Sequence, residues 1–522
     1  MANDSSRLPH ADFAAPILRS RHSDRRIGAA IATAVALLLG FAIAHFMPRG
    51  PATATQALIV MVTSFAVGGV AGLVMRSRWA MLLATIAYII AIEIGRFHII
   101  GPTVDAIRLN DPYGVLALIL GRGFHGLVGI LPMIVGVQWG IAIARSLSDK
   151  LVPKINSIHS IKLGGWAISA TIALVILAVL IALPASTPPI LGTNGKPLAG
   201  SIASLEKVRL GGHDQWIMLR GHSIDKPVLL YLSGGPGQSD LPFSRVLFDD
   251  LSRNFVVVSW DQRGTGKSYA ALDPTSTLTL DRAISDTIEL TQYLRDRFDE
   301  KKIYLLGESW GSTLGVLAIQ RQPESYYAYI GSGQMVSQRE TDRRIYQDIL
   351  ELAIKTRDTS LAAKMQAYGE PPYADSPYAN AFVGGQYDRL HQPYSPPQSY
   401  IQRGKAANIE PMGLLGSEYN LVEKVNVLRG LIDMFTVMYP QLQNIDFRQT
   451  AKQLEVPVYL LVGAAELNGR SDLATEWFDM LKAPRKQRFT FENSSHSVVF
   501  EQFEAFSKIM TETILPETYQ KI

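Results

Sequence analysis

The sequence predicts a chain of two parts, an all-α membrane domain followed by an α/β domain with a largely parallel sheet. Residues 27–183 consist mainly of Ala, Ile, Leu, Val and Gly, in stretches long enough to cross a bilayer. After residue 200, short runs rich in Val, Ile, Leu and Tyr alternate with longer amphipathic stretches, a pattern typical of strands alternating with helices. At 522 residues the chain also exceeds what one hydrophobic core usually supports.

Composition excludes several classes of function. The formal net charge is only +4 and no long block of like charge occurs, so a nucleic-acid partner is not expected. Because the chain contains no cysteine, it can form no disulfide, no thiolate metal site and no cysteine nucleophile.

Five apolar stretches are expected to form helices that span a membrane, since each span needs about 20 mostly apolar residues. They are residues 27–47, 56–75, 79–94, roughly 126–144 and 163–183. The apolar run 113–120 could extend the fourth span or form a re-entrant piece. The first stretch is too long for the core of a signal peptide, and four more follow it. Glu93, the one acidic residue in these runs, lies within a turn of Arg96 and is expected to have a structural or interfacial role.

Basic residues predict the orientation of these spans. The tail 1–26 and the second and fourth loops carry most of them: Arg7, Arg19, Arg21, Arg25, Arg26, Arg76, Arg78, Arg145, Lys150, Lys154 and Lys162. The alternate loops carry the smaller set Arg49, Arg96, Arg108 and Arg122. A cytoplasmic amino terminus and five crossings place the second domain on the outer face, periplasmic or extracellular, of what is expected to be a bacterial plasma membrane. Residues 185–200 are the expected linker after the membrane domain 27–184.

Six strands are expected in the second domain: 227–233, 255–260, 303–306, 327–330, 456–462 and 488–491. Each ends near Gly, Asp, Glu or Ser, and functional groups in parallel sheets gather at such strand ends. The stretch 338–447 is too long for a loop in a compact domain and is expected to be a lid. It divides the domain core into a first part, 201–337, and a second part, 448–522.

A nucleophile motif follows the strand 303–306. Gly307-Glu308-Ser309-Trp310-Gly311 has the pattern G-x-S-x-G and precedes a helix-forming run at 312–320. A nucleophile on a tight strand-to-helix turn needs small residues two places before and after it, because the turn is crowded. The helix amino terminus also favours developing negative charge. The motif predicts Ser309 as nucleophile, although an ordinary strand–helix turn would give the same pattern.

Two later segments supply a base and an acid. His496 follows the strand 488–491, and of the histidines near this domain (His213, His222, His391 and His496) it alone follows a late core strand. Glu466 follows the strand 456–462, and Asp472, six residues on, is the alternative acid. The chain order Ser, acid, His is that of nucleophile-elbow enzymes.

These residues predict an acyl-enzyme mechanism. Ser309 attacks a carbonyl carbon, His496 takes its proton, and Glu466 stabilises the imidazolium. The glycine-rich loop Ser233–Gly237 places the N–H of Gly235, with that of Trp310, as the expected oxyanion hole. The mechanism needs no metal and no organic cofactor.

The motifs resemble those of the prolyl iminopeptidase-like branch of the α/β-hydrolases. The resemblance rests on Gly234-Gly235-Pro236-Gly237, on Asp261-Gln262-Arg263-Gly264-Thr265-Gly266-Lys267-Ser268, on the nucleophile motif, and on Ser495-His496-Ser497. It covers roughly residues 201–335 and 456–510. It implies the α/β-hydrolase fold with a mainly helical lid, and a structural turn at Asp261 and Arg263 with an internal ion pair.

The same resemblance implies a small-molecule or short-peptide substrate with a free amino terminus. Lid carboxylates receive that terminus in the family, and the available ones here are Glu340, Glu351, Glu418 and Glu423. Two positions depart from the family pattern: Ser233 stands where His is common, and Glu466 stands where Asp is usual.

Two further interpretations remain open from the sequence. Attachment to a lipid bilayer would suit an esterase or lipase that acts on membrane-derived or small acyl esters. A non-enzymatic sensor or transport-associated protein with a hydrolase-like domain is the other, although Ser309, Glu466 and His496 are all present. The sequence leaves the oligomeric state undetermined.

Overall fold

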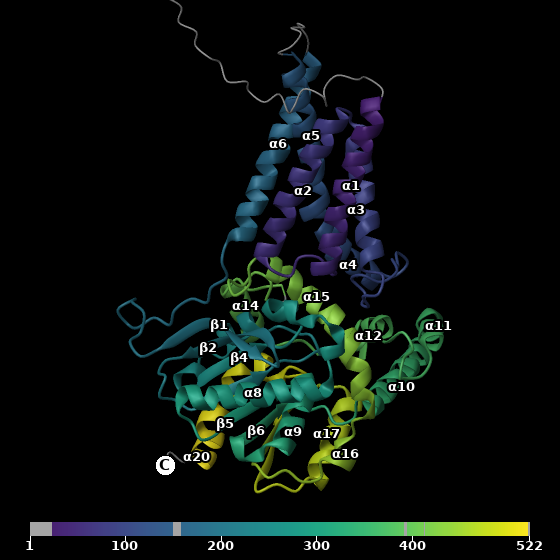
Figure 1. Ribbon diagram of the computed structural model, residues 1–522. Coiled ribbons are helices and arrows are strands. Elements are labelled where there is room, and N and C mark those ends of the chain that lie inside the picture. The colour runs from purple at the N-terminus through teal and green to yellow at the C-terminus, as the bar shows by residue number, and fades with distance from the viewer. Residues whose placement is uncertain (1–22, 150–157, 391–393, 412, 520–522) are drawn as a thin grey trace, which may run out of the picture. The chain divides into compact units, whose positions relative to one another are not determined.

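A computed structural model describes residues 23–149, 158–390, 394–411 and 413–519 (Figure 1). Most of the expected tail, with Arg7, Arg19 and Arg21, lies outside these residues, as do Lys150, Lys154 and His391. The chain forms two compact units, which we call the helical unit (Met1–Ile99 with Gly121–Ala182) and the hydrolase unit (Ile100–Leu120 with Leu183–Ile522).

The helical unit contains a helix at each expected span. These are α1 (Ser23–Phe46), α2 (Ala54–Met75), α3 (Trp79–Gly95), α5 (Phe124–Asp149) and α6 (Ile158–Ala182). In the described part of the chain, four helical stretches are long and apolar enough to cross a membrane: Arg25–Phe46, Ala54–Met75, Pro112–Leu147 and Gly165–Ala182. Trp79–Gly95 is apolar but shorter. The run 113–120 is continuous with the fourth expected span, because α4 (Pro112–Leu118) continues through a π-helix (Ile119–Gly123) into α5.

Glycines bring α2 and α5 into backbone contact. A Cβ on Gly68 would lie 2.0 Å from the Met133 carbonyl oxygen, and a Cβ on Gly140 would lie 2.1 Å from that of Gly69. Small residues permit such close approach between apolar helices. Elsewhere in this unit Glu93 forms ion pairs with Arg96 and, at 2.9 Å, with Arg122. Two basic partners are compatible with the structural role expected for Glu93.

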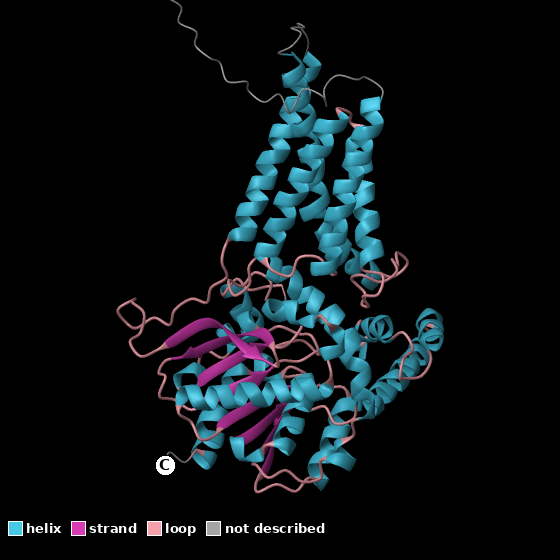
Figure 2. Cartoon of the chain, in the orientation of Figure 1, coloured by secondary structure: helices cyan, strands magenta, loops and turns pink. Residues whose placement is uncertain are grey.

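An eight-stranded sheet forms the centre of the hydrolase unit (Figure 2), in the order β1-β2-β4-β3-β5-β6-β7-β8. The strands are β1 (Ile202–Leu210), β2 (His213–Gly221), β3 (Val228–Leu232), β4 (Val256–Asp261), β5 (Ile303–Glu308), β6 (Tyr326–Ser332), β7 (Val458–Gly463) and β8 (Lys486–Phe491). Neighbours from β4 to β8 are parallel, whereas β2 is antiparallel to both β1 and β4. The six expected strands are therefore confirmed as β3 to β8.

The β1–β2 hairpin was not expected. Its first strand alternates exposed and buried side chains only near its end and carries Glu206, Lys207 and Arg209, so it lacks the continuous apolar run of a buried strand. The buried strands β3, β4 and β5 do have such runs, and every residue in them is buried.

Helices cover both faces of the sheet (Figure 2). One face packs against α7 (Leu241–Leu247) and the carboxyl-terminal helices α18 (Val498–Glu501) and α19 (Phe503–Lys508). On the other face lie α8 (Leu280–Phe298) and α9 (Trp310–Arg321). This three-layer arrangement is the expected α/β architecture.

The insertion between β6 and β7 is mainly helical, and we keep the name lid for it from the expectation above. Its helices are α10 (Gln338–Thr356), α11 (Thr359–Tyr368), α12 (Ser376–Gly384), α13 (Tyr387–Leu390), α14 (Gln398–Ala406) and α15 (Leu421–Met438). Apolar residues of α10 to α13, with Leu467, form a small core of their own. After a 3₁₀-helix (Tyr439–Asn444) and α16 (Phe447–Thr450), the chain returns to the sheet at β7, followed by α17 (Asn468–Met480).

Residues 100–120 belong to the hydrolase unit, whereas the expected domain boundaries assigned them to the membrane domain. Thr103 donates to the Asp433 carboxylate of α15 from its N–H (3.3 Å) and from its hydroxyl (2.7 Å). Asp433 is fully buried and also accepts from Tyr269 Oη at 2.7 Å. Arg108 forms an ion pair with Asp375 beside α12. A polar loop can thus bind the lid although its neighbours in sequence are apolar helices.

Candidate active site

Ser309 lies at the turn between β5 and α9, in a strained conformation with φ 52° and ψ −118°. Its N–H donates to Ser332 O at 3.0 Å. A Cβ on Gly307 would lie 2.4 Å from Gly311 O, and a Cβ on Gly311 would lie 2.0 Å from Leu232 O. The two glycines of the motif are therefore required by the crowding of the turn, and they leave Ser309 half-buried at the carboxyl edge of the sheet.

His496 and Glu466 contact each other at the same edge. The Nδ1 atom of His496 is hydrogen-bonded to Glu466 Oε2. The other carboxylate oxygen accepts from Leu467 N at 2.8 Å and from Arg470 Nη1 at 3.4 Å. Burial raises the pKa of Glu466, but the charges of His496 and Arg470 and these hydrogen bonds outweigh burial and bring the pKa down to about 2. Glu466 is therefore an ionised carboxylate beside the imidazole.

Asp472, the alternative acid, lies on α17 away from His496. Its side chain is 61% exposed and faces Arg344 Nη1 at 4.0 Å. The carboxylate that contacts His496 in this structure is that of Glu466.

The residues next to Ser309 and His496 are bound to each other. Ser497 Oγ donates to Glu308 Oε1 at 3.2 Å. The backbone oxygen of Ser332 accepts the N–H of Ser309. The next residue, Gly333 (φ 54°), packs closely on the histidine, since a Cβ on Gly333 would lie 2.8 Å from His496 Cε1. Within the described residues no hydrogen bond joins Ser309 Oγ to His496, but such bonds often tighten only when substrate binds.

The expected oxyanion loop lies beside the nucleophile turn. Gly235 has φ 111°, a conformation that favours glycine, and a Cβ on it would lie 2.5 Å from Gly237 N. In the described part of the chain, neither the Gly235 N–H nor the Trp310 N–H has a hydrogen-bond partner. Both donors are thus available to a ligand.

Gln262 connects this loop to the nucleophile turn and was not singled out from the sequence. Its Nε2 donates to Ser233 O at 3.2 Å, and its Oε1 accepts from Trp310 Nε1 at 2.9 Å. The sequence feature that could have indicated Gln262 is its place as the second residue of the motif Asp261–Ser268.

The turn at Asp261 and Arg263 differs in one respect from the expectation. Asp261 accepts from Lys267 N at 2.8 Å and from Tyr419 Oη at 3.0 Å. Arg263 pairs with Asp286 of α8 at 2.8 Å, so its ion pair reaches outside the turn. Burial raises the pKa of Asp261 to about 7.

Three of the four lid glutamates are already paired with basic residues. Glu340 pairs with Arg343 at 2.9 Å and with Arg344 at 3.1 Å, Glu418 pairs with Arg245, and Glu423 pairs with Lys267 at 2.8 Å. Glu351 is exposed on α10. Among the described residues none of the four has a hydrogen bond or ion pair with Ser309 or His496.

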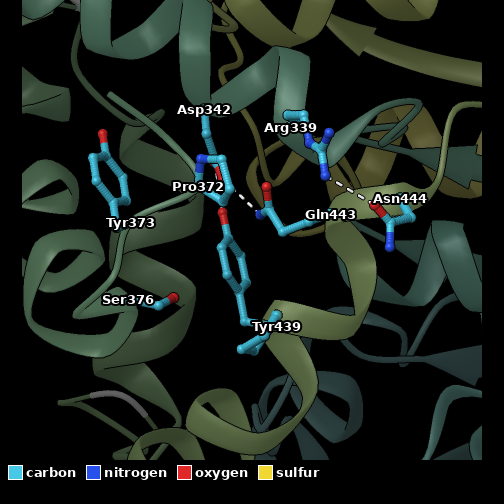
Figure 3. A pocket seen from close by; sticks show the side chains of 9 residues that line it. Arg339, Asp342, Pro372, Tyr373, Ser376, Tyr439, Gln443 and Asn444 are labelled. Atoms are coloured by element: carbon cyan, nitrogen blue, oxygen red, sulfur yellow. Dashed lines mark hydrogen bonds between the residues drawn. The ribbon is translucent and has the colours of Figure 1, made fainter. Parts of the chain in front are cut away.

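A cavity of about 240 Å³ lies between the lid helices and the segment that follows α15 (Figure 3). Its lining includes Asp342, which accepts from Tyr439 Oη at 2.6 Å and from Gln443 Nε2 at 2.9 Å. Gln443 Oε1 and Tyr373 Oη are buried in this part of the described structure without a hydrogen-bond partner. Separately, no group of three or more His, Asp or Glu side chains suited to a metal ion occurs in the described ranges.

Comparison with known proteins shows what the hydrolase unit is similar to. A family model described as "alpha/beta hydrolase fold" matches residues 227–404. The probable aminopeptidase YbaC of Bacillus subtilis (strain 168) is 28% identical over 321 residues, which cover 60% of this chain and 97% of that protein. The probable proline iminopeptidase of Leptolyngbya boryana is 34% identical over 131 residues, covering 24% of this chain and 37% of that protein.

A solved structure, the proline iminopeptidase-related protein from Thermus thermophilus, matches 61% of this chain and 98% of its own, with 19% sequence identity and a TM-score of 0.42. The sheet order, the strand-to-helix turn at Ser309 and the sequence relatives all agree with the α/β-hydrolase fold. The hydrolase unit is therefore a hydrolase of the α/β fold, and its sequence is similar to the prolyl iminopeptidase-like branch of that fold.

Proposed function

We propose that this chain is a membrane-anchored serine hydrolase in which Ser309, His496 and Glu466 form the catalytic triad. The observation that carries the proposal is the contact of His496 Nδ1 with the buried, ionised Glu466. The residue after His496, Ser497, is hydrogen-bonded to Glu308, which directly precedes Ser309. A carboxylate at Nδ1 fixes the tautomer in which Nε2 is free to accept a proton.

In this mechanism Ser309 Oγ attacks the carbonyl carbon of the substrate while His496 Nε2 accepts the hydroxyl proton. The N–H groups of Gly235 and Trp310 hold the oxyanion, and the helix α9 adds the favourable potential of its amino terminus. His496 then protonates the leaving group, and water activated by His496 releases the acyl group from Ser309.

We propose short peptides with a free amino terminus as the substrates. The names of the B. subtilis and L. boryana relatives, an aminopeptidase and a proline iminopeptidase, support this assignment. An esterase is the second candidate, because three lid glutamates are already neutralised by basic partners and so offer little to a substrate ammonium group.

Covalent labelling tests the triad. The purified full chain in detergent should react with a fluorophosphonate probe, and the variants Ser309→Ala and His496→Ala should not. Labelling that persists in Ser309→Ala would refute the nucleophile, and an unlabelled wild-type chain would favour the non-enzymatic interpretation. Turnover of proline nitroanilide against a nitrophenyl ester then distinguishes peptidase from esterase.

We propose that the apolar helices anchor the chain in a bilayer with the hydrolase unit on the outer face. Four helical stretches are long enough to cross, and Trp79–Gly95 must also cross for the amino terminus and the hydrolase unit to lie on opposite sides. Since the chain has no cysteine, a single Ser223→Cys substitution would report the side directly through an impermeant maleimide on intact cells. Labelling only after lysis would require an even number of crossings.

A further inference from the structure

Glu308, the residue before the nucleophile, is a buried acid. It is the last residue of β5 and is only 2% exposed. Its Oε2 atom has no hydrogen-bond partner among the described residues. A buried carboxyl group is costly unless its surroundings compensate it, so its place one residue from Ser309 requires an explanation.

The contacts of Glu308 join three segments of the candidate site. Its Oε1 accepts from Ser497 Oγ at 3.2 Å, and Ser497 follows His496. A Cβ on Gly234 would lie 2.5 Å from Glu308 Oε2 and 3.3 Å from Ser309 Cβ, so the glycine of the oxyanion loop makes room for this carboxyl group. Glu308 therefore lies between the nucleophile turn, the histidine loop and the oxyanion loop.

The titratable groups around Glu308 contain one base. His496 acts on it from the loop after β8, Glu466 from the loop after β7, and Asp240 from the position directly before α7. The phenols of Tyr231 (β3) and Tyr400 (α14) also interact electrostatically with Glu308. Asp240 has its own donors in Tyr231 Oη and Gln238 Nε2, each at 2.9 Å.

His496 is thus the group whose charge can compensate an ionised Glu308. Burial raises the pKa of Glu308 to about 7, and the charge of His496 acts in the opposite direction. A carboxyl group with such a pKa changes its charge in the range where a histidine base operates.

We propose that Glu308 is a positioning residue that ties the nucleophile turn to the histidine loop and supplies a second negative charge to His496. The proposal rests on the triad proposed above. Glu466 stabilises the imidazolium through Nδ1, and Glu308 adds a charge on the side of Ser309. When His496 takes the proton from Ser309, the developing positive charge is then flanked by two carboxylates.

Two variants separate the charge of Glu308 from its hydrogen bond. Glu308→Gln keeps the shape and an acceptor for Ser497 but removes the charge. Ser497→Ala removes the hydrogen bond and keeps the charge. The measurement is the pH dependence of kcat/KM and of fluorophosphonate labelling, with the full chain in detergent.

The charge predicts a specific change in Glu308→Gln. Without the nearby negative charge the protonated, inactive form of the site is less stabilised, so the acid limb of the profile should move to lower pH by roughly one pH unit. The coupled limb of the wild type should also become a single ionisation. At pH 8 kcat should fall about tenfold, because the imidazolium formed in the reaction is less stabilised. Ser497→Ala should keep the wild-type limb, with kcat lower by a few fold.

If Glu308→Gln is active and the acid limb of its pH profile of kcat/KM lies where that of the wild type does, the proposal is overturned, whatever the kcat of the variant. If that variant does not fold, Glu308→Asp replaces it: a retained limb near that of the wild type supports the charge, and a limb displaced to lower pH contradicts it. Failure of the proposed function can be told apart from failure of this inference, because in the former case the wild-type chain itself would not be labelled by the fluorophosphonate.

Discussion

His496 Nδ1 is hydrogen-bonded to Glu466 Oε2, although the two residues follow different strands. The strands β7 and β8 are parallel neighbours, with Val462 opposite Thr490 and Gly463 opposite Phe491. The segments that follow these two strands therefore leave the sheet at the same edge. A short loop after each strand is enough to bring the carboxylate to the imidazole. The geometry of the proposed triad thus follows from strand register, and five predictions test its consequences and those of the surrounding packing.

Glu466→Gln should lower kcat by on the order of a thousandfold or more, because the amide cannot stabilise the imidazolium or hold the correct tautomer. Asp472→Asn is the matched control, since Asp472 is exposed and faces Arg344, and it should leave kcat/KM within about twofold. Steady-state kinetics of both variants check this. A large loss in Asp472→Asn with little loss in Glu466→Gln would reverse the assignment of the acid.

The contributions of Glu466, Glu308, Asp261 and Asp240 to the stability of the hydrolase unit should together be greatest near pH 4 to 5. The pKa of Glu466 is lowered to about 2 in the fold, so its stabilisation is present above the unfolded pKa of about 4.3 and is lost as the pH falls toward 2. Burial raises the pKa of Glu308 and Asp261 to about 7 and that of Asp240 to about 6. The folded state therefore binds more protons than the unfolded chain between about pH 4 and 7, and stability declines as the pH rises through that range.

Differential scanning fluorimetry from pH 3 to 9 measures this dependence. Asp261→Asn should flatten the decline between pH 5 and 7, because it removes one of the three buried acids that lose a proton there. An equal slope in the variant and the wild type would contradict the raised pKa of Asp261.

Gln262→Leu should lower kcat by about ten- to a hundredfold with little change in KM. The substitution removes the bonds to Ser233 O and Trp310 Nε1, so the two oxyanion donors lose their fixed separation. Gln320→Leu is the control, because Gln320 lies exposed on α9 and its side chain bonds, among the described residues, only to Thr450 O. Equal kcat values for the two variants would show that the bridge has no catalytic consequence.

Gly68→Ala should destabilise the helical unit, whereas Gly69→Ala should be tolerated. A Cβ on Gly68 would lie 2.0 Å from Met133 O and would force α2 away from α5, while the nearest atom to a Cβ on Gly69 is 3.9 Å away. Melting temperatures in detergent compare the two variants. Similar melting temperatures would mean that α2 and α5 do not pack through this glycine face.

Thr103→Val should cost the hydrolase unit about 1–3 kcal/mol, because it removes the hydroxyl donor to the buried Asp433 carboxylate. Arg108→Gln, which removes a pair with Asp375 that is nearly half exposed on both sides, should cost about 0–1 kcal/mol. Thermal unfolding of the full chain gives both values. A larger loss in Arg108→Gln would mean that the ion pair, and not the buried hydrogen bond, holds residues 100–120 to the lid.

Local patterns predicted much of the molecule. The buried strands β3, β4 and β5 appear in the sequence as continuous apolar runs, and Gly307 and Gly311 mark the nucleophile turn because no larger residue fits there. The chain order of Ser309, Glu466 and His496 and the length of the insertion 338–447 follow directly from position in the sequence. These features depend on backbone geometry and periodicity within a few residues.

The tertiary structure decided the features that depend on distant partners. It alone placed Glu466, and not Asp472, against His496, paired Arg263 with Asp286, and showed what surrounds Glu308. It also assigned residues 100–120 to the hydrolase unit through the contact between Thr103 and Asp433. Such contacts join segments tens to hundreds of residues apart, and they form only when strand register and helix packing bring those segments together, which no local pattern specifies.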